Sequence, residues 1–135
     1  MRMENPKESG LRPGLRGELS ARVTEGNTAE SLDSGALPVL ATPYMIALME
    51  GAAWHSVQPY LEEGCGTVGT ALDVRHLAPT PVGRTVRCES LLTGVEGRKL
   101  TFSVQVYDGA KLIGEGSHER FIIRVDSFLK KAYGG

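Results

Sequence analysis

The spacing of apolar residues changes twice along the chain, and it predicts a strand, a helix and then a series of strands. Between residues 15 and 23, apolar side chains alternate with polar ones, and this period of two is typical of a half-buried strand. Residues 44–57 are apolar around nearly the whole circumference of a helix, which is typical of a helix enclosed by other structure. The alternation then returns in four segments, at residues 67–76, 84–93, 99–107 and 111–125.

The expected helix has recognisable start and stop signals. Thr42 followed by Pro43 predicts the start, because a threonine hydroxyl can accept an unpaired backbone N–H and proline at the first helical position loses no hydrogen bond. Pro59 predicts the approximate end, since an interior proline breaks the hydrogen-bond ladder. We therefore expect Thr42 to be the helix N-cap, a role that can coexist with a catalytic one.

The segments outside this pattern differ in composition. Residues 1–14 are polar and rich in proline and glycine, so we expect a flexible N-terminal arm followed by a single domain over residues 15–135. Residues 25–40 form a connection that is long for a compact domain, which favours a functional loop or lid. We expect residues 126–133 to form a short helix or a frayed tail.

This order of elements indicates an α+β fold. An antiparallel sheet of five strands that curls around the one apolar helix would bury that helix. Short connections such as Asp108-Gly109 favour hairpins between the later strands. Such a sheet has free edges and only one helix to cover it, so we expect two copies to associate through an edge or a face of the sheet.

Composition and charge exclude several classes of protein. Fifteen Lys and Arg against sixteen Asp and Glu leave a formal net charge of -1, so no overall field favours nucleic acid or an anionic membrane as a partner. The chain has no apolar run of about 18 residues and no apolar signal core near its start, which favours a cytoplasmic protein. Cys65 and Cys88 lack metal-ligand spacing and are expected to be ordinary thiols. Phosphate-binding and dinucleotide-binding glycine motifs, zinc motifs and the G-x-S-x-G elbow are absent.

Three residues have side chains suited to hydrolysis. Glu50 lies within the apolar helix, and we expect it to be paired or used, because burying a carboxylate alone is costly. His76 falls on the more apolar face of the 67–76 strand, where a lone histidine is more commonly hydrogen-bonded to a carbonyl than catalytic. Taken with Thr42, however, these residues supply the hydroxyl, carboxylate and imidazole of a hydrolytic site.

Three further residues give less specific signals. Gly69, on the opposite face of the same strand, lacks a side chain and so lets a ligand approach the backbone, with a strand bulge as the alternative. Arg120 is either an ion-pair partner or a charge beside the site. For His118, on the last strand, we expect a structural or peripheral role.

Several segments, in this order along the chain, resemble the hotdog-fold thioesterases, and specifically the fluoroacetyl-CoA thioesterase family. They cover roughly residues 15–130 and comprise Thr42-Pro43 to Glu50-Gly51-Ala52, Pro59-Tyr60-Leu61, Gly69-Thr70-Ala71 to His76, Ala78-Pro79-Thr80-Pro81, Gly94-Val95-Glu96-Gly97-Arg98 and His118-Glu119-Arg120. The resemblance implies a hotdog fold, hydrolysis of an acyl-CoA without a metal or cofactor, and a homodimer with active sites at the protomer interface.

The resemblance also implies roles by position. Thr42, Glu50 and His76 fall on the catalytic residues of the family, Gly69 falls on the glycine near the thioester carbonyl, and Arg120 falls on an arginine near the pocket. The carboxylate would attack the thioester carbonyl or activate water, and the family favours the covalent route. The threonine would orient the reacting groups, and the histidine would act as general acid and base.

One departure from the family concerns the substrate. The fluoroacetyl-specific enzyme has phenylalanines in its lid at places that align with Asp33 and Ala36. A lid without those rings keeps the site less dry, so we expect a short-chain acyl-CoA thioesterase that is not selective for fluoroacetyl-CoA. The Asp-x-Asn-x-x-His type of arrangement that resembles hydratases of this fold is absent. A non-catalytic dimer that binds acyl-CoA or another small ligand remains the alternative.

Overall fold

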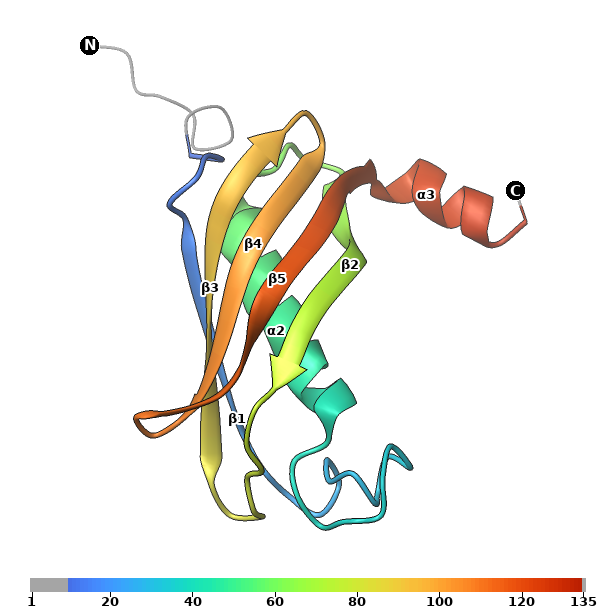
Figure 1. The fold of residues 1–135 in the computed structure, drawn as a ribbon. Helices are drawn as coiled ribbons and strands as arrows, with labels where there is room; N and C mark the ends of the chain where they lie inside the picture. The colour runs from blue at the N-terminus through green and yellow to red at the C-terminus, as the bar shows by residue number, and fades with distance from the viewer. Residues whose placement is uncertain (1–9, 135) are drawn as a thin grey trace.

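A five-stranded antiparallel sheet packs against one long helix in the computed structural model, which describes residues 10–134 (Figure 1). The elements, in chain order, are β1 Arg16–Arg22, α2 Thr42–Val57, the 3-10 turn η1 Gln58–Tyr60, β2 Cys65–His76, β3 Thr85–Glu96, β4 Lys99–Asp108, β5 Lys111–Arg124 and α3 Val125–Ala132. The predicted α+β fold and its order of elements are confirmed, and the segment after β5 is helical.

The strands lie in the order β1-β3-β4-β5-β2, so β1 and β2 form the two edges of the sheet. Short turns join β3 to β4 and β4 to β5, and each of these neighbours pairs antiparallel. Strand β2 pairs with β5, although β3 and β4 separate the two strands in the chain. The outer edge of β2 therefore pairs with no strand among residues 10–134.

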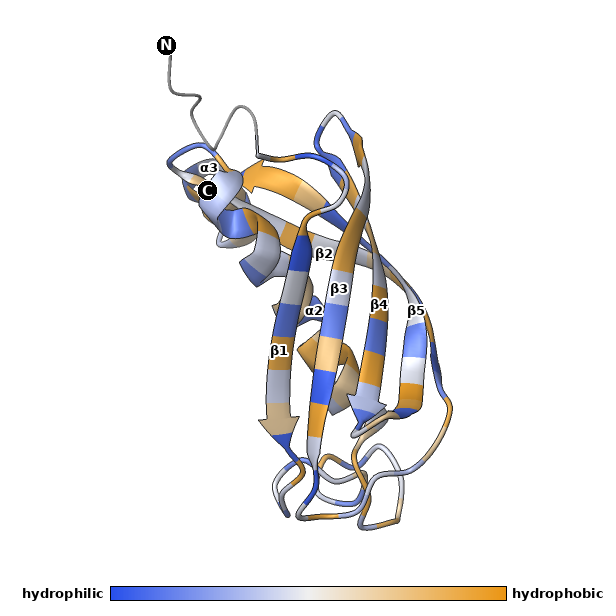
Figure 2. Cartoon of the chain, turned by 90° about the vertical axis from the view of Figure 1, so that its left-hand side faces the viewer, coloured by the Kyte–Doolittle hydropathy of each residue, from blue (hydrophilic) through white to orange (hydrophobic). Residues whose placement is uncertain are grey.

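The hydrophobic core lies between α2 and the inner face of the sheet. Met45, Met49 and Ala52 of the helix are buried together with Phe102 and Val104 of β4. Full burial of a large apolar side chain stabilises a fold by about 1.5–3 kcal/mol. Figure 2 shows apolar and polar residues alternating along β3, as expected for a strand with one buried face.

A bulge in β2 changes which of its side chains face the helix. The register against β5 shifts between Gly69 and Ala71, so Thr70 is the additional residue in the strand. Strict alternation would put Gly69 and His76 on opposite faces, whereas both face α2 in the structure. The expectation of opposite faces is therefore wrong.

The start of the long helix differs from the sequence prediction. Thr42 is the first helical residue, Ala41 is the N-cap, and no side chain caps the helix. The predicted N-cap role of Thr42 is wrong, because its hydroxyl bonds to His76 at the end of β2 instead.

Helix α2 is not enclosed on all sides within one chain. Pro43, Ala47, Glu50 and Trp54 recur at intervals of three or four residues and so share one face of the helix. Each of them is exposed or half-exposed, so residues 10–134 of one chain do not by themselves provide the expected enclosure on this face. The predicted catalytic carboxylate belongs to this uncovered stripe.

The connection between β1 and α2 is an ordered loop without an α-helix. A bridge between Thr28 and Leu40 joins its two ends. Asn27, which is buried, donates from Nδ2 to the Arg22 carbonyl and accepts the Thr24 N–H. These contacts hold the predicted lid at the end of the molecule where α2 begins (Figure 1).

The predicted N-terminal arm falls partly outside the described residues, which exclude residues 1–9. Gly14 donates its N–H to the Leu92 carbonyl at 2.8 Å, and Leu11 packs against the core. The boundary of the arm stays a prediction. Within residues 10–134, no helix is long and apolar enough to cross a membrane.

Candidate active site

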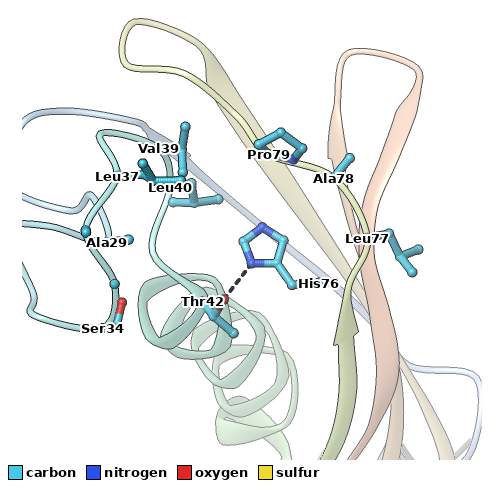
Figure 3. A pocket seen from close by; sticks show the side chains of 12 residues that line it. Ala29, Ser34, Leu37, Val39, Leu40, Thr42, His76, Leu77, Ala78 and Pro79 are labelled. Carbon is cyan, nitrogen blue, oxygen red and sulfur yellow. Dashed lines mark hydrogen bonds between the residues drawn. The ribbon is translucent and has the colours of Figure 1, made fainter.

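The first predicted pair of site residues joins the start of α2 to the end of β2. Thr42 Oγ1 and His76 Nδ1 are hydrogen-bonded at 2.8 Å (Figure 3). The other ring nitrogen of His76, Nε2, is buried and has no hydrogen-bond partner among residues 10–134. Burial lowers the pKa of His76 below its ordinary value of 6.5, and the Ala78 backbone opposes this only in part. The imidazole is therefore neutral near pH 7, and Nε2 is free to accept a proton in the tautomer whose Nδ1–H donates to Thr42.

A cavity of about 350 Å³ adjoins this pair. One wall is the lid and the other is the segment that follows β2, with Thr42 and His76 between them (Figure 3). The lining residues are mainly small or apolar, and they are Ala29, Ser34, Gly35, Ala36, Leu37, Val39, Leu40, Thr42, His76, Leu77, Ala78 and Pro79. A mostly apolar cavity with a few convergent polar groups is suited to a small organic ligand.

The second predicted group surrounds Glu50. Its Oε2 accepts a hydrogen bond from Nη1 of Arg120 at 3.2 Å, in an ion pair between a buried guanidinium and a carboxylate side chain that is 38% exposed. A Cβ atom added to Gly69 would collide with the same Oε2. The space left by the missing side chain at position 69 is therefore occupied by the Glu50 carboxylate. The carboxylate is fixed by its ion pair with Arg120 and remains accessible to solvent.

Arg120 is itself held on three sides. Its Nε donates to Thr67 Oγ1 at 2.8 Å and its Nη2 donates to the Thr67 carbonyl at 3.0 Å. Its Nη1 lies 3.2 Å from Nε2 of His118. Burial lowers the pKa of Arg120, whereas the charge of Glu50 raises it; an arginine nevertheless stays charged in a protein.

His118 is fully buried, and its surroundings decide which ring nitrogen carries the proton. Nδ1 lies 2.9 Å from the Ala71 carbonyl, which can only accept, so Nδ1 is protonated. Nε2 then accepts from Arg120. Burial lowers the pKa of His118 below 6.5 and so favours this neutral form. The expected structural role is consistent with the burial, but the contact with Arg120 also connects His118 to Glu50.

Within one chain the five predicted residues form two groups. Thr42 and Glu50 are eight residues apart in α2, which corresponds to roughly 12 Å along the helix axis. His76 lies seven residues beyond Gly69 in β2. The structure thus places Thr42 with His76, and Glu50 with Gly69 and Arg120.

Sequence reasoning missed two members of the second group, Thr67 and His118. The spacing of His118 and Arg120 at two residues places both on one face of a strand, and this was the available signal. Nothing local indicated Thr67, because its contact with Arg120 spans 53 residues. Among the described residues, no three His, Cys, Asp or Glu side chains are grouped so that they could hold a metal ion.

The fold and these two groups define a class of protein. A carboxylate on the central helix, a threonine–histidine pair at the helix start and an apolar cavity are the kinds of group that an acyl-transfer site needs, and the five-stranded sheet packed on that helix is the hotdog fold of thioesterases. Residues 23–126 match the family of fluoroacetyl-CoA-specific thioesterases. The chain belongs to this family and is a thioester hydrolase.

Relatives of known structure or curated function agree with this assignment. The chain is 46% identical over 93 residues to a fluoroacetyl-CoA thioesterase of Streptantibioticus cattleyicolor, in a match that covers 69% of this chain and 67% of the relative. A crystal structure of a phenylalanine-to-alanine variant of the fluoroacetyl-CoA-specific thioesterase, in complex with fluoroacetate and CoA, superposes with a TM-score of 0.82 at 40% identity, over 87% of this chain and 99% of that one. A hypothetical protein of Thermus thermophilus, described as a thioesterase superfamily member, gives a TM-score of 0.80 at 29% identity, over 90% and 94% of the two chains.

Proposed function

We propose that the protein hydrolyses short-chain acyl-CoA thioesters to the free acid and CoA, with Glu50 as the reacting carboxylate. The observation that carries this proposal is the placement of Glu50, which a buried arginine holds against the backbone of Gly69 while the carboxylate remains accessible. A nucleophile or base needs this combination of fixed position and access to the substrate. The family assignment supplies the thioester as the substrate class.

The proposed reaction has two steps. A carboxylate oxygen of Glu50 bonds to the thioester carbonyl carbon, the C–S bond breaks, and CoA leaves as the thiolate. The Gly69 N–H stabilises the negative charge that develops on the carbonyl oxygen, together with the start of α2 from a second copy of the chain. His76 then takes a proton from water, the hydroxide cleaves the mixed anhydride, and the proton passes to the thiolate. In the alternative route, Glu50 itself takes the proton from water. An acyl adduct on Glu50, trapped by acid quench and identified by mass spectrometry, distinguishes the covalent route.

We also propose that a complete site combines two copies of the chain. The two groups of site residues lie roughly 12 Å apart along α2, and β2, which contributes to both, is an edge strand of the sheet formed by residues 10–134. If two β2 strands pair antiparallel about a two-fold axis, the His76 end of one copy lies beside the Cys65 end of the other. This pairing moves the threonine–histidine pair of one copy toward Glu50 of the other, and it brings the uncovered stripe of α2 near its counterpart.

Mixing two inactive variants tests the shared site. Glu50→Gln retains Thr42 and His76, whereas His76→Ala retains Glu50. After denaturation and refolding at equal amounts, half of the dimers are mixed and each has one complete site. We therefore expect about a quarter of the parent activity. A chain that contains its whole site regains nothing on mixing, and sedimentation of the parent as a monomer contradicts the proposal as well.

For the substrate, we propose a short acyl group without strong preference for fluoroacetyl. The lid, residues 25–40, contains no Phe, Tyr or Trp. Ala36 contributes only a methyl group to the cavity wall, and Asp33 is an exposed carboxylate. A small, open wall of this kind excludes water less well than aromatic rings, so fluoroacetyl-CoA and acetyl-CoA should differ little in kcat/KM.

A second candidate is hydrolysis selective for fluoroacetyl-CoA, which the 46% identity to a fluoroacetyl-CoA thioesterase favours. Thiol release from acetyl-, fluoroacetyl-, butyryl- and hexanoyl-CoA separates the two candidates. A ratio of kcat/KM for fluoroacetyl-CoA over acetyl-CoA above about 10³ supports the second. If none of these thioesters releases thiol, or if Glu50→Gln is as active as the parent, the proposed reaction is wrong.

A further inference from the structure

A continuous chain of hydrogen bonds connects the bulge of β2 to the proposed reacting carboxylate. The Ala71 carbonyl accepts from Nδ1 of His118 at 2.9 Å, Nε2 of His118 accepts from Nη1 of Arg120 at 3.2 Å, and Nη1 donates also to Glu50 at 3.2 Å. Each link has one direction only, because the carbonyl cannot donate and the guanidinium cannot accept.

The three side chains converge on one point of the strand. A Cβ atom added to Gly69 would lie 3.2 Å from Nη1 of Arg120 and 3.3 Å from Cε1 of His118, in addition to its collision with Glu50. The side chains of His118, Arg120 and Glu50 therefore all pack against the backbone of Gly69. Phe102 supports the imidazole from the core side, with ring centroids 6.0 Å apart.

We propose that His118 is a positioning residue for Glu50, which it orients by accepting a hydrogen bond from Arg120. This inference rests on the proposed role of Glu50. Thr67 anchors one edge of the guanidinium through Nε and Nη2, which leaves the Nη1 corner to be fixed. Nη1 carries two hydrogens, and the structure gives one to the carboxylate and one to the imidazole. Without the imidazole, only the carboxylate itself holds that corner, so neither group is independently fixed.

The positioning role differs from simple filling of the core. A core histidine needs only its volume and a partner for its donor, both of which the Ala71 contact supplies. The acceptor at Nε2 is not required for either purpose, yet it faces the buried guanidinium of Arg120, which also contacts Glu50. Catalytic groups must be held within a fraction of an ångström, and this depends on the residues behind them.

Two substitutions separate the donor function of His118 from its acceptor function. His118→Asn places an amide N–H near the position of Nδ1 and retains the bond to Ala71, but it ends short of Arg120. His118→Gln reaches the position of Nε2, so its amide oxygen can accept from Arg120, while the bond to Ala71 is lost. The two variants are matched in polarity and differ in which partner they keep.

The positioning role predicts opposite outcomes for the two variants in acyl-CoA hydrolysis. We expect His118→Asn to lower kcat about tenfold or more with KM changed less than about threefold, because the loss is in the transition state. His118→Gln should recover most of the parent kcat. In the Glu50→Gln background, His118→Asn should lower the residual rate no further. Equal losses in both variants that follow their melting temperatures, or no loss in His118→Asn, overturn the proposal.

A second measurement does not depend on turnover. In side-chain ¹⁵N NMR spectra, a guanidinium held at Nη1 shows separate, slowly exchanging Nη signals. Thr67 still holds Nε and Nη2 in all three proteins, so we expect the Arg120 Nη signals to exchange faster in His118→Asn than in the parent and in His118→Gln. If the parent hydrolyses no thioester, the proposed function is wrong, and the NMR comparison still decides whether His118 fixes Arg120. Identical Arg120 signals in all three proteins contradict the positioning role whatever the activity.

Discussion

The hydroxyl of Thr42 lies 2.8 Å from Nδ1 of His76, so the first residue of α2 is tied to the last residue of β2. The helix starts without a side-chain cap as a consequence. The contact orients an imidazole whose second nitrogen is buried and has no hydrogen-bond partner in the described part of the chain. The threonine that the sequence predicted as a local helix cap thus makes its hydrogen bond to a residue 34 positions away in the chain.

Replacing Thr42 should affect catalysis more than folding. We expect Thr42→Val to lower kcat about tenfold or more, because one hydrogen bond of roughly 1.4 kcal/mol that orients His76 is lost. Thr42→Ser retains the hydroxyl and should keep most of the activity. Thermal unfolding of Thr42→Ser should resemble the parent, and Thr42→Val should unfold only a few degrees lower, because it loses this one bond and no helix cap. A Thr42→Val enzyme with parent kcat contradicts the orienting role.

Stability should fall in mild acid because of His76 and His118. Burial lowers the pKa of both in the folded state, below the value of 6.5 expected when unfolded. Between these values the unfolded chain binds more protons, so stability is fully present above pH 6.5 and is lost as pH falls toward the folded-state pKa values. Urea unfolding at a series of pH values measures how steeply the free energy of unfolding changes with pH. Each histidine contributes to this slope the equivalent of roughly one bound proton at most. His76→Gln should reduce this slope, and a slope unchanged by the substitution contradicts the assignment.

Any side chain at position 69 should displace Glu50. The methyl group of Gly69→Ala would collide with the carboxylate oxygen that faces Arg120, and a displacement of about 1 Å at a reacting group can cost roughly 10²-fold in rate. We expect a large loss of kcat in steady-state assays. Gly66→Ala is the matched control on the same strand, because a methyl group there comes no closer than 3.4 Å to a neighbour. Comparable losses in the two variants would indicate a general effect on β2.

The two cysteines should differ in reactivity. Cys88 is buried in the core, and burial raises the pKa of its thiol to about 12. The thiolate is the reactive species, so native protein at pH 8 should react with a thiol reagent at Cys65 alone. Cys65→Ser should abolish the reaction until the chain is unfolded. Rapid labelling of Cys88 in the folded protein contradicts the expectation.

A ring in the lid should change substrate preference. Ala36 lines the cavity beside Thr42 and His76, so Ala36→Phe places an aromatic surface there and excludes water from the site. We expect the ratio of kcat/KM for fluoroacetyl-CoA over acetyl-CoA to rise severalfold. Ala36→Leu adds apolar volume without a ring and serves as the control. If the parent already discriminates strongly, the lid argument is wrong and selectivity arises elsewhere.

The sequence predicted the parts of this fold that depend on local periodicity. The period of two in β3 and the continuous apolar character of α2 each reflect neighbours a few residues away, and the element order follows from them. The position of Glu50 on an uncovered stripe did not follow, because the apolar residues around it hide which face of the helix is open. Thr67 was missed as a partner of Arg120 because a hydrogen bond between two strands leaves no spacing signal in either one. For His118 the two-residue spacing from Arg120 was a signal, but spacing alone does not show that the two side chains are bonded.

The additional residue in β2 sets the phase of the strand. Thr70 shifts the alternation by one position, which allows Gly69 before it and His76 after it to face the same helix. Deleting this residue would leave every other residue of the strand unchanged and still turn the part of β2 on one side of the deletion away from α2. The number of residues between Gly69 and His76 is therefore constrained more tightly than their identity. Substitutions at intervening outward-facing positions should be tolerated where a one-residue insertion or deletion is not.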